Sequence, residues 1–598
     1  MNLQEKLFNK AKKYHMSGQF KEAKNIYLDL IKLNEKNFLL HNLAGTTFLQ
    51  LNEYDKAIKY LNIAIKLNPN FADSYNNIGI AFAEKQQFQK ANDCYDKAII
   101  LKKNFFDAIL NKSIALKNLV EYEESIKCLN LCIKINPKNS KIYINLGNIF
   151  VILKRYKDAK SAYDKAISLN KSYSEAYSNR GELFQKHIKD IKSAIHDYEK
   201  ALKINNKLKF VYGKMIHAKM YINDWNNFDK QITNLKREIK NKQLITLPFP
   251  ILSLIDDPEI HKIIAEEYSK EIYTKLNEFD QKKLKIKNKI KIGYFSARFY
   301  DCATLHNMLD VFKNHNKDEF EIYAFNYGPT DTWTEKIKKY FNYFYDISKL
   351  PVKNIIKLAS DKELQIAINL TGHTFNARDE IFSNQVAPIQ INFLGYPGTM
   401  GTKIYDYIIA DKTVISEDLK KFYSEKVLNL PNCYLPNQSN QIVSNKKFER
   451  KDFGIPEKKF VFGCFNNSYK ITPSIFSCWM DILRRTDGSV LWLLQDDKIG
   501  QKNLLNEVKK QKINTNRIFF AERIAVEKHI KRIELIDLFL DTFPYNAHTT
   551  AKEAIKMKVP VLTMMGRSFA SRVAASLLKN IGLDELIVNN LKDYTELA

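Results

Sequence analysis

The stretch Asp541-Thr-Phe-Pro-Tyr-Asn-Ala-His-Thr-Thr550 joins an apolar segment to an amphipathic one. Residues 535–540 before it predict a short buried strand, and residues 551–557 after it have apolar side chains at helical spacing. The triplet His548-Thr-Thr550 therefore stands where a turn enters a helix. Unpaired N–H groups and the helix dipole make such an end a seat for phosphate, and two hydroxyls and an imidazole can donate there. The alternative is an ordinary N-cap, in which one threonine caps the helix and the histidine is solvated.

Composition limits the classes of protein to which this chain can belong. Its 598 residues favour several domains, and a hydrophobic content of 45% is enough for large cores. The net charge of +27 comes from lysines spread along the chain rather than from a basic tail, so we expect no nucleic-acid partner. The seven cysteines form no CxxC pair and no disulfide framework. The polar N-terminus and the lack of a long apolar run predict a cytoplasmic protein with no membrane partner.

Residues 1–206 repeat with a period of 34 residues. Aromatic residues keep this step at Phe20, Tyr54, Phe88, Tyr122 and Tyr156. Small residues keep it at Gly45, Gly79, Ser113, Gly147 and Gly181, and again at Ala23, Ala57, Ala91, Ser125 and Ala159. This period is typical of tetratricopeptide repeats, in which small residues let paired helices approach closely. We predict an α-solenoid of six units, the sixth with one extra residue near Lys189, whose extended concave face binds protein segments.

Residues 207–285 predict a helical connector. Helical periodicity extends over Val211–Lys242, and the Pro-containing run 247–250 interrupts it. Another helix is expected from Asp256 to about Asn277. The charged run 281–289 is most simply a solvated linker, and it marks the best domain boundary in the chain.

Residues 286–598 alternate between strand-like and helical segments. The strand-like segments are 290–295, 320–325, 364–369, 389–394, 405–410, 460–465, 490–494, 517–520, 535–540 and 559–563. Apolar strands that alternate with helices predict parallel sheets, and the polar stretch near 432–450 divides them into two sets. We therefore expect two doubly wound lobes, residues 286–440 and 441–598. Their ligand should bind beyond the C-terminal strand ends, in the crevice between the lobes.

Two loops are candidate parts of that site. Lys470 follows the strand at 460–465, where its ammonium could neutralise a diphosphate; otherwise it is one of many surface lysines. The Gly-rich loop Leu394-Gly-Tyr-Pro-Gly-Thr-Met-Gly401 follows another strand and can bring backbone N–H groups close to a sugar. Its spacing matches neither the dinucleotide fingerprint nor the P-loop, and a plain turn is the alternative.

Several motifs together resemble one enzyme family. They are Ile292-Gly-Tyr-Phe-Ser, Asn369-Leu-Thr-Gly-His-Thr, Ala387-Pro-Ile-Gln, Leu394-Gly-Tyr-Pro-Gly-Thr, Tyr423-Ser-Glu-Lys, Phe465-Asn-Asn-Ser-Tyr-Lys, Val490-Leu-Trp-Leu-Leu, Tyr545-Asn-Ala-His-Thr-Thr and Ala570-Ser-Arg-Val-Ala-Ala-Ser. In this order, behind a repeat array, they resemble the O-linked N-acetylglucosamine transferases of glycosyltransferase family 41. The resemblance implies a GT-B fold of two Rossmann-like lobes. It also implies inverting transfer from UDP-N-acetylglucosamine (UDP-GlcNAc) to Ser or Thr hydroxyls of proteins, without a metal or other cofactor.

The resemblance also assigns roles to individual residues. Catalysis falls to Lys470, which holds the diphosphate, to His548 and to His306. Nucleotide contacts fall to Asn467, Lys470, His529, Arg532, His548, Thr549, Thr550 and Glu553, the last in place of an aspartate that faces the ribose in many members. Acceptor and sugar contacts fall to His373, Gly395, Tyr396 and Pro397. No metal ligands are implied, and no Asp-x-Asp or His/Cys cluster stands where a phosphate would bind.

Two departures from the family pattern matter. The loop after the first strand has Cys302 where the family has its first histidine, so only His306 remains. A thiol with an ordinary pKa near 8.5 is a poor general base, which leaves His306, another group or no base at all to receive the proton. The chain also stops at Ala598, whereas family members usually continue. The resemblance therefore predicts looser closure of the lobes, or a sequence that is a piece of a longer chain.

Other functions stay open on the sequence. One is protein O-fucosylation from GDP-fucose, as in SPINDLY-type enzymes, although Tyr545-Asn-Ala-His-Thr-Thr fits the N-acetylglucosamine branch better. Another is a non-catalytic repeat scaffold that binds a sugar nucleotide, which Cys302 and the short C-terminus favour. Repeat arrays of this kind sometimes form homodimers.

Overall fold

The computed structural model describes residues 3–273, 289–439, 443–495 and 497–598. The chain divides into two compact units, Met1–Leu183 and Phe184–Ala598. The expected linker and the domain boundaries near 285 and 440 fall largely outside the described residues. The division at 183 falls inside the sixth predicted repeat.

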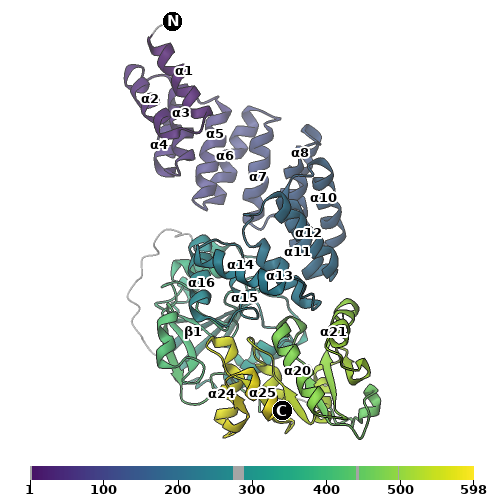
Figure 1. The fold of residues 1–598 in the computed structure, drawn as a ribbon. Helices are drawn as coiled ribbons and strands as arrows, with labels where there is room; N and C mark the ends of the chain where they lie inside the picture. The colour runs from purple at the N-terminus through teal and green to yellow at the C-terminus, as the bar shows by residue number, and fades with distance from the viewer. Residues whose placement is uncertain (1–2, 274–288, 440–442, 496) are drawn as a thin grey trace. The chain divides into compact units, whose positions relative to one another are not determined.

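The first unit is an array of antiparallel helix pairs (Figure 1). Its helices are α1 (Leu3–Met16), α2 (Phe20–Leu33), α3 (Phe38–Gln50), α4 (Tyr54–Leu67), α5 (Ala72–Glu84), α6 (Phe88–Leu101), α7 (Phe106–Asn118), α8 (Tyr122–Ile135), α9 (Ser140–Ile152), α10 (Tyr156–Leu169) and α11 (Ser174–Leu183). Each aromatic residue of the repeat begins the second helix of a pair. The predicted tetratricopeptide solenoid is thereby confirmed.

Small residues allow close contact within each pair. A Cβ atom on Gly79 would lie 2.4 Å from the ring of Tyr95, and one on Gly45 would lie 2.5 Å from Leu61. No side chain larger than hydrogen fits at either position without displacement of its neighbour. In the fourth pair serines replace the glycine and the alanine, and the hydroxyl of Ser125 donates to the carbonyl of Ser113 at 2.6 Å.

The extra residue of the sixth repeat is absorbed by a π-helix. The turns inside successive pairs each have one residue with positive φ, at Asn52, Gln86, Val120, Lys154 and Lys189. The first four of these are 34 residues apart, and the last step is one residue longer. The π-helix Phe184–Ile188 follows α11 directly and provides the wider turn.

The second unit begins with five helices: α12 (Ile191–Ile204), α13 (Val211–Tyr221), α14 (Phe228–Lys240), α15 (Pro248–Ile251) and α16 (Pro258–Ile272). The helical periodicity of Val211–Lys242 is thus two helices rather than one. The helical conformation is interrupted between them, where Asn223 and Asn227 have positive φ. The helix expected to reach about Asn277 ends at Ile272.

Two parallel sheets follow, which confirms the two doubly wound lobes. The first lobe has β1 (Ile290–Ser296), β2 (Phe320–Asn326), β3 (Tyr343–Asp346), β4 (Ile366–Asn369), β5 (Ile389–Asn392), β6 (Tyr407–Asp411) and β7 (Lys426–Leu430), in the order β3-β2-β1-β4-β5-β6-β7. Helices α17 (Ala303–Lys313), α18 (Thr332–Ile337) and α19 (Val352–Asp361) connect the first strands.

The second lobe repeats the same winding. Its strands are β8 (Val461–Cys464), β9 (Val490–Leu494), β10 (Ile518–Ala521), β11 (Leu538–Leu540), β12 (Val561–Met564) and β13 (Ile587–Val588), in the order β10-β9-β8-β11-β12-β13. Its helices are α20 (Pro473–Arg485), α21 (Lys498–Lys510), α22 (Val526–Arg532), α23 (Thr549–Lys556), α24 (Val573–Asn580) and α25 (Leu591–Leu597).

Three strands lack a counterpart among the sequence predictions, and all three are edge strands. β3 and β7 flank the first sheet, and β13 flanks the second. β7 is mostly exposed, so it lacks the apolar run by which a buried strand is recognised. Strand β11 is shorter than predicted, because residues 533–535 form a 3₁₀ turn.

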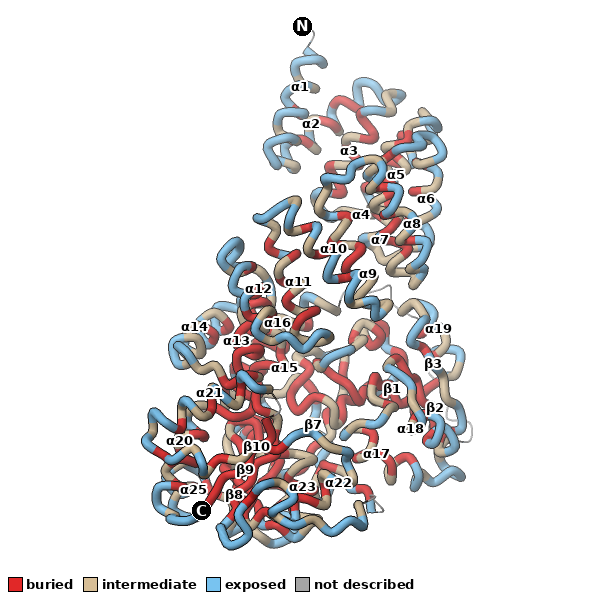
Figure 2. Tube along the Cα trace, turned by 90° about the vertical axis from the view of Figure 1, so that its right-hand side faces the viewer, coloured by how far each residue is buried: buried red, intermediate tan, exposed pale blue. Residues whose placement is uncertain are grey.

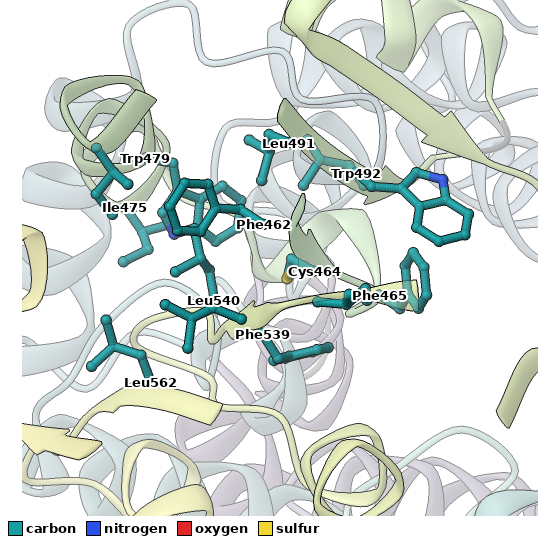
Figure 3. Packing of buried hydrophobic residues seen from close by; sticks show 14 of the residues in the cluster. Phe462, Cys464, Phe465, Ile475, Trp479, Leu491, Trp492, Phe539, Leu540 and Leu562 are labelled. Carbon is teal, nitrogen blue, oxygen red and sulfur yellow. The ribbon is translucent and has the colours of Figure 1, made fainter. Parts of the chain in front are cut away.

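The core of the second lobe lies around β8 and β9, whose residues are all buried (Figure 2). Trp479 from α20 and Trp492 from β9 are fully buried there (Figure 3). The ring of Phe465 meets Trp492 edge-on with centroids 4.9 Å apart. This core holds the strand ends from which the site loops leave.

The connector helices contact both lobes of the second unit. The Ser269 hydroxyl of α16 donates to the carbonyl of Met400 in the first lobe at 2.5 Å. Asp256, ahead of α16, accepts from the backbone N–H groups of Arg567 and Ser568 in the second lobe, both at 2.8 Å. The connector therefore ties the lobes together beside the loops of the site.

Candidate functional site

The site is expected where the strand order reverses in each sheet. β1 has β2 and β4 as neighbours, and β8 has β9 and β11, so each sheet has a switch point next to its first strand. Loops that leave the C-terminal ends of strands at such a point splay apart and leave room for a ligand. The loops after β8 and β11 carry Lys470 and His548-Thr-Thr550. The first turn of α17, after β1, carries His306.

Lys470 is a buried cation and not a surface lysine. Only 7% of its surface is exposed, and its ammonium donates to the carbonyl of Asn546 at 2.8 Å. The same nitrogen lies 3.7 Å from the centroid of the Tyr545 ring. Burial lowers the pKa of Lys470 to about 8, and the nearby carboxylate of Asp541 opposes this shift. A poorly solvated ammonium of this kind interacts strongly with an anion that replaces its water.

Asp541 anchors the loop after β11. Its carboxylate accepts from the N–H of Ala547 at 2.6 Å and from the Thr563 hydroxyl at 2.7 Å. The side-chain amide of Asn466 lies 3.2 Å from the same carboxylate. Burial raises the pKa of Asp541. Asp541 therefore ties the turn that carries the His-Thr-Thr triplet to the loop that carries Lys470.

The N-terminus of α23 has no capping side chain. His548 is its N-cap residue and makes no side-chain capping bond, so the ordinary-cap alternative does not hold in this structure. Burial and the charge of Lys470 hold the pKa of His548 well below its usual range, so the imidazole is neutral. Its Nε2 hydrogen donates to the carbonyl of Ala570 at 3.3 Å. In this arrangement the donors left for an anion are the half-buried Thr549 and Thr550 and the backbone N–H groups.

Three other candidates belong to α22 and to the loop after β8. Arg532 is buried beside the rings of Phe465 and Trp492 and donates to Nδ1 of His529 at 2.7 Å. Burial lowers the pKa of His529 to about 3, so its one hydrogen resides on Nε2. Arg532 thus orients His529. The side-chain amide oxygen of Asn467 accepts from Arg523 at 2.8 Å.

The Gly-rich loop after β5 is firmly packed. A Cβ on Gly395 would lie 2.1 Å from the Leu370 carbonyl, so only glycine fits there. Tyr396 and Pro397 are both buried. The buried carboxylate of Glu425 accepts from the Thr399 hydroxyl and from the N–H of Met400, both at 2.6 Å.

His373 is buried beneath that loop. Its Nδ1 lies 2.8 Å from the Asp379 carboxylate and its Nε2 lies 3.0 Å from the Met400 carbonyl. The rings of Tyr268 and Tyr396 flank it, with centroids 4.9 and 5.3 Å away. Both ring nitrogens are engaged, so His373 holds the loop in place in this arrangement.

The loop after β1 presents one histidine and one thiol. Nε2 of His306 donates to the Asp301 carboxylate at 2.7 Å, and the ring packs edge-on against Trp333. That bond leaves the Nδ1 lone pair to accept a proton. The thiol of Cys302 is directed at the carbonyl of Arg298 at 3.5 Å, and burial raises its pKa. Of these two groups, His306 is the better base.

Four residues of the site are missing from the sequence predictions. Asp541 belongs to the opening stretch, but its role depends on burial. Asp301 is an acidic residue five positions before the histidine that it orients. Asn307 and Lys552 meet between the lobes, on α17 and α23. A lysine within a short amphipathic helix, as at Lys552, is a weak sequence signal for such a contact. Beside it, Glu553 is 8% exposed.

Two general features accompany this site. In the ranges that the structure describes, no three His, Cys, Asp or Glu side chains gather closely enough to hold a metal ion. Within the same ranges, no helix is both long enough and apolar enough to cross a bilayer.

Comparison with known families agrees with this architecture. The sequence pattern of glycosyl transferase family 41 matches residues 260–448 and 438–598. The chain belongs to glycosyl transferase family 41. The tetratricopeptide repeat pattern matches residues 106–139 and 174–208, and a second repeat pattern of this class matches 45–86 and 147–187.

Curated relatives match part of this chain over part of their own length. A protein named probable UDP-N-acetylglucosamine–peptide N-acetylglucosaminyltransferase SEC, from Arabidopsis thaliana, is 37% identical over 52% of this chain and 32% of its own length. The UDP-N-acetylglucosamine–peptide N-acetylglucosaminyltransferase of Caenorhabditis elegans is 25% identical over 63% of this chain and 44% of its own. The match thus spans less than half of either relative.

One solved structure supports the fold of this family 41 chain. A mutant of the Thermobaculum terrenum O-GlcNAc transferase superimposes with a TM-score of 0.59 and 20% sequence identity. The match covers 82% of this chain and 88% of that one. At this identity the likeness concerns the fold.

Proposed function

We propose that this chain transfers N-acetylglucosamine from UDP-GlcNAc to Ser or Thr hydroxyls of proteins, with inversion at the sugar carbon. Membership of family 41 and the names of the curated relatives support this reaction. One structural observation carries the proposal. The ammonium of Lys470 is buried in the loop after β8, and the loop after the neighbouring strand β11 enters α23, whose N-terminus has no capping side chain.

The nucleoside diphosphate is the leaving group in this scheme. As the bond from the sugar carbon to the phosphate oxygen breaks, negative charge develops on the diphosphate. The Lys470 ammonium and the N–H groups at the start of α23 are fixed in place before the reaction, so they stabilise this charge without reorganisation. These groups supply the charge stabilisation that a metal ion could provide, and we infer that no metal ion is needed.

The acceptor hydroxyl must lose its proton as it attacks. We assign this proton to Nδ1 of His306, because Asp301 holds the other ring nitrogen and stabilises the imidazolium that forms. The oxygen of the acceptor then forms the new bond to the sugar carbon while UDP departs.

The repeat array supplies the protein acceptor. Asn77, Asn111, Asn145 and Asn179 recur with the 34-residue step on the first helices of successive pairs. The Asn111 amide donates to Asn76 at 3.1 Å, and that of Asn179 donates to Asn148 at 3.1 Å. A row of amides along a solenoid can pair with the backbone of an extended segment and raise its concentration near the enzyme.

The test is transfer of labelled sugar. The protein is incubated with labelled UDP-GlcNAc and an extract of its source cells, beside the Lys470→Met variant, which keeps side-chain length and removes charge. We expect label on Ser or Thr residues and a loss of about 10²-fold or more in the variant. Lys498→Met, exposed at the start of α21, is the matched control.

Competition by unlabelled nucleotides tests the donor. UDP should inhibit transfer and GDP should not. Inhibition by GDP alone would favour fucose transfer. Tight binding of UDP without any labelled protein would refute the transferase and leave a scaffold that binds a sugar nucleotide.

A further inference from the structure

Three side chains from the two lobes form a short polar relay. Asn307 on α17 donates from its amide nitrogen to the hydroxyl oxygen of Thr549, at 3.2 Å. The ammonium of Lys552, one turn further along α23, donates to the amide oxygen of Asn307. Asn307 and Lys552 are buried, with 3% and 8% of their surfaces exposed. The relay therefore joins the first lobe to the first residue of α23.

The chemistry of the three groups fixes the direction of every hydrogen in the relay. An ammonium can only donate, so the face of Asn307 towards Lys552 must be its oxygen. The amide nitrogen then faces Thr549, whose oxygen receives that hydrogen. The hydroxyl hydrogen of Thr549 must point elsewhere. In the part of the chain that the structure describes, that hydrogen has no acceptor.

The segment that passes between the lobes contacts both helices of the relay. Lys552 also donates to the carbonyl of Pro436, at 3.3 Å, in the segment that passes between the lobes. The carboxylate of Asp310, one turn after Asn307, accepts from the N–H and the hydroxyl of Ser439, at 2.8 and 2.6 Å. The Asn307 amide itself is held by Thr549 at its nitrogen and by Lys552 at its oxygen, so it has little freedom to rotate.

We propose that Asn307 is a positioning residue for the sugar nucleotide. It orients the Thr549 hydroxyl so that the hydroxyl hydrogen points at the phosphate bound at the start of α23. This inference rests on the proposed function, because it takes the anion at α23 to be the diphosphate of UDP-GlcNAc. Donor binding then depends on a side chain from the opposite lobe, which never touches the nucleotide.

The decisive variant is Asn307→Asp. It preserves size, and the carboxylate still accepts from Lys552, so the contact between the lobes is retained. The new side chain can only accept, so the Thr549 hydroxyl turns towards it and away from the phosphate. We expect the dissociation constant for UDP to rise about tenfold or more, because a hydrogen bond to a charged group is lost. A purely structural role predicts unchanged affinity.

The same substitution in a protein that already carries Thr549→Val, the second background, separates this effect from simple charge repulsion. Thr549→Val removes the hydroxyl at constant shape. On that background, Asn307→Asp should change UDP affinity by less than about twofold if the hydroxyl carries the effect. Ser439→Ala, which removes the hydroxyl bond to Asp310 outside the relay, should leave UDP affinity unchanged.

The outcomes divide clearly when UDP binding is measured by titration calorimetry, with thermal unfolding to verify the fold. Equal losses from Asn307→Asp in both backgrounds would overturn the positioning role and point to electrostatic repulsion. Unchanged affinity in the single variant would overturn it as well. Failure of the unaltered protein to bind UDP would instead refute the proposed function, and the inference with it.

Discussion

The proposed reaction depends most on Lys470, and the burial of this residue predicts an upper pH limit for the site. The pKa of this ammonium is lowered to about 8, so the free protein loses the charge as the pH rises through that value. Because a bound diphosphate favours the charged form, affinity is present below pH 8 and is lost above it.

We expect UDP to bind about tenfold more weakly at pH 9 than at pH 7, measured by calorimetry at constant ionic strength. In the Lys470→Met variant, UDP affinity should depend much less on pH. Burial also lowers the pKa of Lys552 to about 8, and we expect this second ammonium to account for the rest of the pH dependence. Constant affinity from pH 7 to 9 in the unaltered protein would contradict the assignment.

His306 and Cys302 should differ sharply in their effect on catalysis. His306→Ala is expected to lower kcat by about 10²-fold or more at saturating donor, because the proton acceptor is removed. Cys302→Ser should change kcat by less than about threefold, since the thiol faces a backbone carbonyl. Transfer to an acceptor peptide measures both. A larger loss for Cys302→Ser than for His306→Ala would reverse the roles.

The helix pairs of the array depend on their small residues. Gly79→Ala places a methyl group 2.4 Å from the Tyr95 ring, and the side chain or helix must move to accommodate it. We expect a loss of about 1–3 kcal/mol in the free energy of unfolding, measured by urea denaturation. Gln89→Ala, exposed on the neighbouring α6, is the control. Equal stability of both variants would show that the pair relaxes freely.

At the scale of the whole chain, the proposed function assigns the protein acceptor to the repeat array and the nucleotide to the site of the second unit, and kinetics should separate the two. Alanine at Asn77, Asn111 and Asn179 together should raise the KM for a protein acceptor about tenfold and leave the KM for UDP-GlcNAc within twofold. Asn92→Ala, on the second helix of a pair, is the control. A rise in the donor KM alone would place the asparagines outside acceptor binding.

Much of the fold can be read from local pattern. The 34-residue period identifies the array, since successive pairs repeat the same close approach of two helices at small residues. Central strands such as β8 and β9 are continuous apolar runs, because both faces of a central parallel strand are covered. Edge strands such as β7, which is mostly exposed, lack that signal.

The sequence by itself determined the repeat class, the two wound lobes and the loops that carry Lys470 and His548, because these depend on neighbouring residues and on family motifs. Only the tertiary structure decided that Lys470 is buried over Tyr545 and that Asn307 meets Thr549. The last two residues are 242 positions apart. Their contact arises from the packing of one lobe against the other, and a pattern of short-range periodicity contains no information about which distant side chains that packing brings together.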